Sequence, residues 1–171
     1  MGANESGGRF QRTVAIVTVS DRSARGERED VSGQVLAERL LAEGYDINLR
    51  MVVADEADKI STALRELADH ARVALIVTTG GTGLAPRDVT PEATEEILTR
   101  TIPGMAEAMR AASLAKTPHA MLSRAVVGVR GATLIVNLPG SPKGALENLA
   151  VLLPALPHAL QKIQGDTSDC A

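Results

Sequence analysis

Short apolar runs alternate with longer amphipathic segments along most of the chain. Runs rich in β-branched and aliphatic residues occupy positions 13–20, 46–53 and 73–77, and this composition predicts buried strands. The segments 32–43 and 57–70 lie between these runs and carry apolar residues at helical spacing. Strands that alternate with helices are typical of an α/β domain whose sheet is mainly parallel. The pattern therefore predicts a three-layer α/β/α architecture.

The second half of the chain departs from this alternation. Its predicted elements are two helices followed by two strands, at 91–100, 105–115, 125–129 and 132–138. Only Arg130-Gly131 separates the two strands, and so short a connection predicts an antiparallel hairpin. A final helix is expected to extend to about residue 164, and Pro154 and Pro157 should kink or break it.

A single domain is expected over residues 12–164. The length of 171 residues suits one folded unit, and no internal repeat or linker divides the sequence. Residues 1–11 are rich in glycine and polar side chains, and residues 165–171 begin with a glycine. We therefore expect a disordered leader and a disordered tail at the two ends.

The composition argues against several classes of protein. The net charge is −3, and the chain contains one Phe, one Tyr and no Trp, which disfavours both a broadly basic nucleic-acid binder and a platform of stacked aromatics. Cys170 is the only cysteine, so no intramolecular disulfide can form, and a reducing, cytoplasmic location is expected. No apolar stretch approaches 18 residues, so no membrane span is expected.

The densest group of chemically useful residues is the segment TTGGTGLAPRDVTPEAT at 78–94. Gly80, Gly81 and Gly83 surround Thr82 at the point where a predicted strand meets a predicted helix. Glycines can adopt positive φ, which allows successive N–H groups to converge into an anion-binding nest. Parallel sheets bind ligands beyond the carboxyl ends of their strands. This segment is therefore expected to form part of the functional site.

Two charged residues set the chemistry of this segment. Arg87 adds a positive charge, whereas Asp88 places an acid beside a loop that favours anions. Such an acid either holds a metal ion or moves a proton, or it only stabilises the N-terminus of the helix that follows. Thr90 is expected to cap that helix, with Pro91 in its first turn.

Three other polar segments also follow predicted strands: Ser20-Asp21-Arg22, Asp55-Glu56 and Asn137-Leu138-Pro139-Gly140. The carboxyl ends of parallel strands meet at one edge of a sheet, so these segments should lie close to Asp88. Glycine loops with two acids, Asp55 and Asp88, suit phosphate chemistry assisted by a divalent metal. Ser20 and Asp21 are equally ordinary in a polar loop, and the last segment also fits a plain turn capped by Ser141, with Pro142 opening the next helix.

Basic residues and histidines add little that is specific. The arginines and the lysine in loops or at loop edges leave room for a local basic site: Arg22, Arg25, Arg28, Arg87 and Lys143. Lys143, beside Pro142, is the softer candidate for a phosphate contact. His70, His119 and His158 are scattered, so we interpret them as surface or packing residues, and neither nucleophilic catalysis nor a structural zinc site is favoured.

The glycine-rich segment and the segment NLPGSPKG at 137–144 together resemble the molybdenum-cofactor family that includes the bacterial MogA and MoaB proteins. Pro103-Gly104 and Met121-Leu122-Ser123-Arg124 support the resemblance, which extends from about residue 14 to residue 163. It implies the molybdopterin-binding fold, a homotrimer, and Mg²⁺-dependent adenylylation of molybdopterin by ATP with release of pyrophosphate. Similar domains occur in fusion proteins such as gephyrin, which implies a molybdenum insertase as a partner.

The resemblance also assigns roles to individual residues. Asp55 and Asp88 match essential acids of the family, so they are expected to act in catalysis and to position Mg²⁺. Together with Ser20 and Asp21 from the strand ends, the residues expected to bind ATP or molybdopterin are Gly80, Gly81, Thr82, Gly83, Ser113, Asn137, Pro139 and Gly140. The chain departs from the family pattern at Ala54, where a proline often stands, and at Ser141, where Asn or Gln often follows Pro-Gly. These departures leave both acids intact and bear on ligand selectivity.

Alternatives stay open within and beyond this resemblance. MoaB-like members are expected to bind the pterin as non-catalytic modules, and the presence of both Asp55 and Asp88 favours the adenylyltransferase over that reading. A nucleotide-sugar or cyclic-nucleotide enzyme that shares only the phosphate loops is a third alternative, which turnover of ATP without pterin would reveal. Trimer or hexamer, molybdenum or tungsten, and the division of ATP and pterin between the two loops are alternatives that the sequence leaves open.

Overall fold

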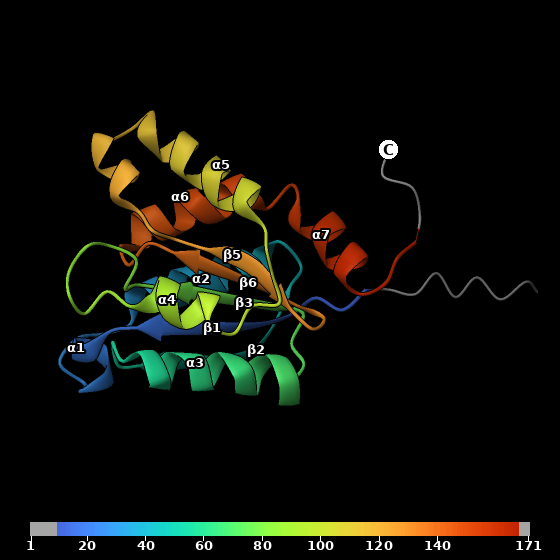
Figure 1. Ribbon diagram of the computed structural model, residues 1–171, viewed down its shortest axis with the longest axis horizontal. Helices are drawn as coiled ribbons and strands as arrows, with labels where there is room; N and C mark the ends of the chain where they lie inside the picture. Colours follow the sequence, from blue (N-terminus) through green and yellow to red (C-terminus); the bar gives the residue numbers. More distant parts are fainter. Residues whose placement is uncertain (1–9, 168–171) are drawn as a thin grey trace, which may run out of the picture.

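The computed structural model describes residues 10–167, which form a six-stranded sheet between two layers of helices (Figure 1). The strands are β1 (Thr13–Val19), β2 (Asp46–Val53), β3 (Leu75–Thr79), β4 (Arg100–Thr101), β5 (Val127–Arg130) and β6 (Thr133–Leu138). The α-helices are α1 (Asp21–Ala24), α2 (Val31–Ala42), α3 (Ala57–Arg65), α4 (Thr90–Glu95), α5 (Pro103–Leu114), α6 (Pro142–Leu152) and α7 (Leu156–Ile163). A π-helix, η1 (Glu66–His70), continues α3, and a 3₁₀ helix, η2 (Pro118–Leu122), follows α5.

The strand order is β2-β1-β3-β6-β5-β4. Strands β1, β2, β3 and β6 run parallel, β5 is antiparallel to β6, and β4 is antiparallel to β5. This confirms the predicted α/β/α class with a mainly parallel sheet and an antiparallel hairpin. The chain passes from β1 to β2 and returns to β3 on the other side of β1. The carboxyl ends of β1 and β3 therefore flank a topological switch point, where α/β sheets bind ligands.

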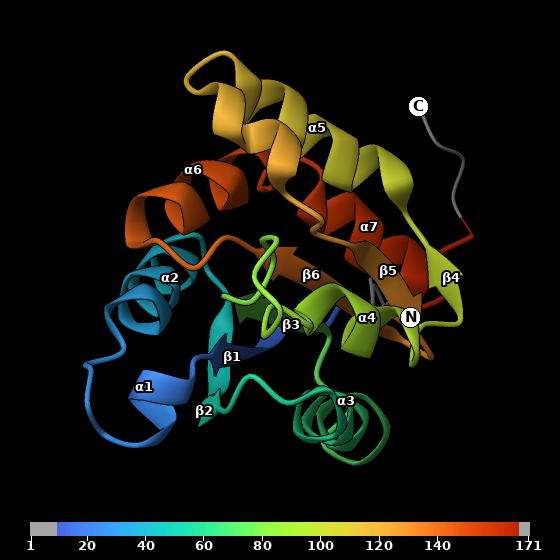
Figure 2. The same ribbon diagram turned by 60° about the vertical axis from the view of Figure 1, so that its left-hand side comes forward.

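Two aliphatic cores fill the space on the two faces of the sheet. On one face, Leu36 of α2, Met109 of α5 and Leu149 of α6 pack together with the sheet. On the other face, Ile60 of α3 and Ile97 beside α4 are almost completely buried. Figure 2 shows α3 on one side of the sheet and α5, α6 and α7 on the opposite side. Every helix within residues 10–167 is too short or too polar to span a bilayer.

The third strand was expected at 73–77 but lies two residues further along the chain. Thr78 and Thr79 belong to β3 because they pair with β1 on one side and with β6 on the other. Both side chains are buried. The sequence suggested a loop from Thr78 because hydroxyls and glycines follow, but Thr is β-branched and fits a pleated, buried strand.

The helix expected at 91–100 is shorter, and it ends at Glu95. Arg100-Thr101 instead form the edge strand β4, paired with β5. Thr90 does not cap this helix. The cap position is Val89, and the Thr90 hydroxyl donates to the carbonyl oxygen of Gly80 at 2.9 Å. These differences arise because pairing with a distant strand outweighs local helix preference.

Expectations for the C-terminal half are largely confirmed. Ser141 caps α6 by accepting from the Gly144 N–H at 3.1 Å, and Pro142 is the first helical residue. The prolines break the final helix into α6 and α7 as expected. The hairpin turn is Gly131-Ala132, with Gly131 at φ +56°. Cys170 and most of the expected leader and tail lie outside the described residues.

Candidate functional site

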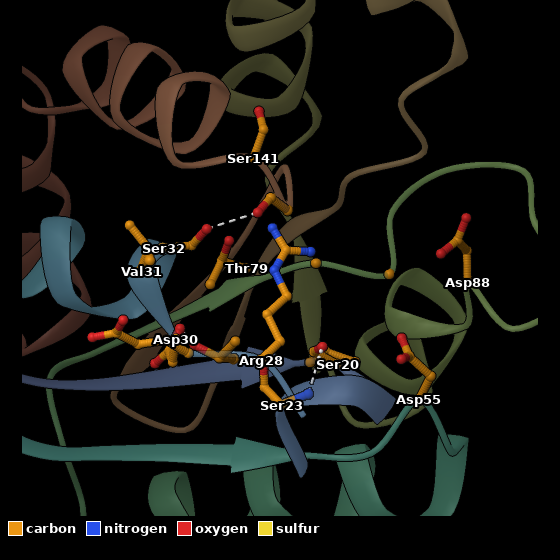
Figure 3. Close-up of a pocket in the computed structure, with 16 residues that line it drawn as sticks. Ser20, Ser23, Arg28, Asp30, Val31, Ser32, Asp55, Thr79, Asp88 and Ser141 are labelled. Carbon is orange, nitrogen blue, oxygen red and sulfur yellow. Dashed lines mark hydrogen bonds between the residues drawn. The ribbon is translucent and has the colours of Figure 1, made fainter. Parts of the chain in front are cut away.

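A cavity of about 380 Å³ lies at the carboxyl ends of the parallel strands (Figure 3). Its walls come from β1, β3, the segment from α1 into α2, and the turn before α6. The lining includes six of the site residues that were predicted from the sequence: Ser20, Asp55, Gly80, Gly81, Asp88 and Gly140. We refer to this space as the first cavity. The sheet topology therefore brings together segments that are up to 120 residues apart in sequence, at the edge where they were expected.

The segment 80–89, here termed the glycine loop, needs its glycines for close approach of backbone. Gly80 and Gly81 have φ of +103° and +66°, a region that other residues rarely adopt. A Cβ atom on Gly80 would collide with the carbonyl oxygen of Val19, and one on Gly140 would lie 3.2 Å from the Gly80 Cα atom. Gly80, Gly81 and Gly140 also line the first cavity, so part of its wall is backbone without side chains, which a phosphate can approach closely.

Asp21 and Asp55 bind each other's backbone. The Asp21 N–H donates to Asp55 Oδ2 at 2.7 Å, and the Asp55 N–H donates to Asp21 Oδ1 at 3.0 Å. Arg87 adds a bidentate contact to the Asp21 carboxylate at 2.6 and 2.9 Å. Hydrogen bonding from Arg87 holds the pKa of the Asp21 carboxyl below its usual range. Asp21 is therefore a neutralised support for Asp55 and does not itself line the first cavity.

The pKa of the Asp55 carboxyl is shifted in the opposite direction from that of Asp21. Burial raises its pKa above the ordinary value, and the negative charges of Asp21 and Asp88 raise it further. The hydrogen bond from the Asp21 backbone and the charge of Arg87 oppose this rise. A half-buried carboxylate near other acids is stabilised by any cation that binds beside it.

Asp88 is fixed by the glycine loop itself. Its Oδ2 atom accepts from the Ala85 N–H at 2.9 Å, and a Cβ atom on Gly83 would lie only 2.8 Å from the same oxygen. From the opposite side, the Arg124 guanidinium donates to the carbonyl oxygens of Gly83 at 2.8 Å and Asp88 at 2.5 Å. Arg124 also pairs with Glu92. Asp88 therefore has a defined position at the rim of the first cavity.

A second cavity, of about 330 Å³, lies on the other side of the glycine loop, against α5, η2 and α6. Its lining contains the predicted residues Thr82, Gly83, Ser113 and Pro139. Ser113 Oγ exchanges hydrogen-bond contacts of 3.2 and 3.5 Å with the Asn148 amide. Ser141 lines both cavities, so the two spaces meet at the start of α6.

Asn137 is expected from the resemblance to bind a ligand, but it lines neither cavity. Its side chain is completely buried, and its Nδ2 group donates to the hydroxyls of Thr78 and Thr94, both at 3.0 Å. Its Oδ1 atom accepts from the Val126 N–H at 3.2 Å. Both polar atoms of the side-chain amide therefore have partners inside the protein, and they join β6 to β3 and α4. Asn137 therefore positions the strand ends.

Several cavity residues were not singled out from sequence. The first cavity also contains Asp30 and Ser32, which looked like an ordinary helix start, and Arg28, which was noted only as a loop cation. The second cavity contains Arg110, Lys116, His119 and Asn148, which sit on helices or at helix ends without a distinctive motif. Lys143, the softer candidate, is exposed and lines neither cavity.

Comparison with known proteins identifies the family. The family described as a probable molybdopterin binding domain matches residues 15–158, which span both cavities. This chain belongs to that family. Within it, the chain is 43% identical over 157 residues to a curated molybdopterin adenylyltransferase from Helicobacter pylori, covering 90% of this chain and 88% of that protein.

One solved structure and one further curated protein are also similar to this molybdopterin-binding domain. The solved structure of the molybdopterin biosynthesis enzyme MoaB from Thermus thermophilus is similar with a TM-score of 0.86 and 52% identity, covering 92% of this chain and 98% of that one. Gephyrin from Dictyostelium discoideum is 45% identical over 157 residues, which cover 86% of this chain but 22% of gephyrin. The expected fold and family are therefore confirmed.

Proposed function

We propose that this chain is a molybdopterin adenylyltransferase, which transfers the adenylyl group of ATP to the terminal phosphate of molybdopterin. The observation that carries the proposal is the pair of cavities that meet at Ser141, one of which contains both Asp55 and Asp88. Two adjoining cavities suit a reaction that joins two phosphate-bearing substrates. Similarity to the Helicobacter pylori enzyme over most of both chains supports the same assignment.

The reaction joins the two substrates through a phosphoryl oxygen. An oxygen of the pterin's terminal phosphate attacks the α-phosphorus of ATP, and the bond from that phosphorus to the oxygen bridging to the β-phosphorus breaks. Adenylylated molybdopterin and pyrophosphate are the products. We assign the phosphates of ATP to the first cavity, where Gly80, Gly81 and Gly140 expose backbone, and the pterin to the second. Fixed backbone dipoles of this kind stabilise charge that develops on phosphate oxygens.

Asp55 and Asp88 are the residues proposed to hold Mg²⁺. No three His, Cys, Asp or Glu side chains among residues 10–167 form a complete metal-binding group. Two carboxylates are nevertheless sufficient for Mg²⁺, which commonly combines one or two carboxylates with phosphate oxygens and water. The raised pKa of Asp55 also fits, because a bound cation relieves repulsion among the acids. When bound, Mg²⁺ would neutralise charge on the phosphates.

The protein's own hydrogen bonds prepare these carboxylates. The Asp21 backbone occupies Asp55 Oδ2, and the Ala85 backbone occupies Asp88 Oδ2. Each hydrogen bond fixes one oxygen of the carboxylate, and the second oxygen takes no part in that bond. Orientation of this kind favours catalysis because the charged groups need not reorganise during the reaction.

The experiment that tests the proposal mixes the protein with molybdopterin, ATP and Mg²⁺ and follows adenylylated pterin by mass spectrometry. The wild-type protein should form product. Asp88→Asn should keep the fold, because an amide oxygen can still accept from Ala85, and should lower the rate by about 10²–10³-fold, as expected for loss of one electrostatic group. Asp58→Asn, an identical change at an exposed position on α3, is the matched control and should retain full activity.

Three outcomes separate the candidate functions. Normal turnover by Asp88→Asn would refute the role of that acid. Tight pterin binding by the wild-type protein without product would establish the MoaB-like binding module instead. Consumption of ATP without pterin would indicate a different nucleotide enzyme.

We further propose that the protein assembles as a homotrimer and delivers its product to a molybdenum insertase. The match to a portion of gephyrin supports a physical link to other domains, because related sequences are fused in one longer chain. Light scattering of the purified protein should give the mass of three chains, and the mass of one or six chains would contradict the assembly.

A further inference from the structure

The segment between α1 and α2 carries a cation into the first cavity. Arg28 extends from this segment, and Figure 3 shows its guanidinium in the middle of the cavity, between the side of Asp55 and Asp88 and the side of Ser32. Arg28 is the only basic residue among the described residues that line this cavity. Its position is therefore unlike that of the other cations on the same segment.

The guanidinium of Arg28 has no partner among the residues that the structure describes, although acids surround it. Nearby, Arg25 pairs with Glu27, and Arg87 pairs with Asp21. Asp30, which lines the same cavity, accepts from the Thr18 hydroxyl and the Gly33 N–H, both at 2.8 Å. Arg28 thus keeps all of its donors for a molecule that enters the cavity.

The chemistry of the cavity indicates which ligand takes these donors. A guanidinium presents a planar fork of N–H groups that matches phosphate oxygens and forms strong, charge-assisted hydrogen bonds. Gly80 and Gly140 line the same cavity, and neither carries a side chain that could keep an anion away from the backbone. Asp55 and Asp88 occupy a different side of the cavity. The cavity therefore has one side for a metal and a second side for uncompensated phosphate charge.

We propose that Arg28 binds the β- and γ-phosphates of ATP, the portion that leaves as pyrophosphate. This inference rests on the proposed adenylyltransferase function, and it adds a binding residue that the glycine loops and the two acids do not supply. When the bond from the α-phosphorus to the bridging oxygen breaks, the electron pair stays with the departing pyrophosphate. The fixed charge of Arg28 stabilises that negative charge in the bound leaving group.

The test measures binding of pyrophosphate and of AMP by calorimetry, with Mg²⁺ and without pterin. Arg28→Gln should weaken pyrophosphate binding by about 10–100-fold, the range for loss of a hydrogen bond to a charged group, and leave AMP binding unchanged. Arg28→Lys should recover part of the affinity, because it keeps the charge without the fork. Arg25→Gln removes an equivalent charge from the same segment outside the cavity and should bind both ligands normally. Arg28 has no partner to lose, so its variants should unfold at the wild-type temperature.

Steady-state kinetics provide the second measurement. Arg28→Gln should raise the KM for ATP, and the KM for molybdopterin should stay at the wild-type value. Unchanged pyrophosphate binding would overturn the proposal, and so would a rise confined to the KM for molybdopterin or an equal loss of AMP binding. A wild-type protein that forms no product but binds pyrophosphate through Arg28 would refute the proposed function and leave this phosphate site in place.

Discussion

Asp55 and Asp21 face each other across the first two strand ends, yet their carboxyls are in opposite electrostatic states. Arg87 hydrogen-bonds to Asp21 and lowers its pKa, whereas burial raises the pKa of Asp55. Carboxyl groups whose pKa is raised by burial and by neighbouring acids are typical of functional sites. Asp21 stabilises the fold, and its backbone N–H fixes the orientation of the Asp55 carboxylate.

The pH dependence of stability tests this difference for Asp55. The folded protein binds the Asp55 proton more tightly than the unfolded chain, so stability falls as pH rises from the ordinary carboxyl range through the raised pKa. In metal-free buffer at pH 7.5, Asp55→Asn should therefore have a higher Tm than the wild type, and the difference should shrink as the pH falls towards 4. The same variant should lose adenylylation. A lower Tm for Asp55→Asn at pH 7.5 would contradict this account of the site.

The glycine loop depends on an element that is distant in sequence. Arg124, which follows η2, binds the carbonyl oxygens of Gly83 and Asp88 through its side chain, and its own N–H donates to the Thr82 carbonyl at 3.0 Å. The residues that precede it line the second cavity. Arg124 therefore connects the wall of the second cavity to the acid of the first, as a positioning residue.

Replacement of this guanidinium should affect catalysis more than binding. Lys lacks the wide planar guanidinium that spans these separate acceptors, so Arg124→Lys should increase amide hydrogen exchange in residues 80–90 and lower kcat with a smaller change in either KM. Arg130→Lys is the matched control, because Arg130 also joins a carboxylate, Asp69, to a carbonyl oxygen, that of Ile97. The control should lose comparable stability and keep its kcat. Equal losses of kcat in both variants would reduce Arg124 to a general structural role.

At the scale of the whole molecule, one sheet separates two cores that share no helix. Because every strand of the parallel core contributes to both faces, damage to either face should destabilise the same cooperative unit. Ile60 and Leu149 are 0% and 1% exposed on opposite faces. They offer a matched pair of probes.

Ile60→Ala and Leu149→Ala should each lower the free energy of unfolding by about 2–5 kcal/mol, the usual cost of truncating a large buried aliphatic residue. Tyr45 is the only tyrosine and belongs to the face of Leu149, so its fluorescence reports on that face, whereas far-UV circular dichroism reports on all helices. The two signals should change together in urea for both variants. Separate transitions would show that the two faces unfold independently.

Sequence patterns predicted the α/β/α class, the antiparallel hairpin, the break between α6 and α7, and the meeting of Asp55, Asp88 and the glycines at one sheet edge. These features follow from local periodicity, from proline and glycine stereochemistry, and from the geometry of parallel strands. Each depends on short segments or on a general rule of topology. These features could therefore be predicted from the sequence.

Tertiary structure alone decided the features that depend on pairing and packing between distant segments. The extension of β3 through Thr79 and the formation of β4 require neighbouring strands, which local propensity does not record. The inward orientation of Asn137 was equally hidden, because a polar residue in a loop motif fits either a ligand contact or an internal hydrogen-bond network. The unpartnered state of Arg28 within residues 10–167 likewise emerges only from the folded chain, where Asp30 accepts from Thr18 and Gly33 instead. The sequence by itself indicated acids and glycines as candidate site residues, because motifs and strand ends are local features. The fold decided which of them line a cavity, because that depends on packing between distant segments.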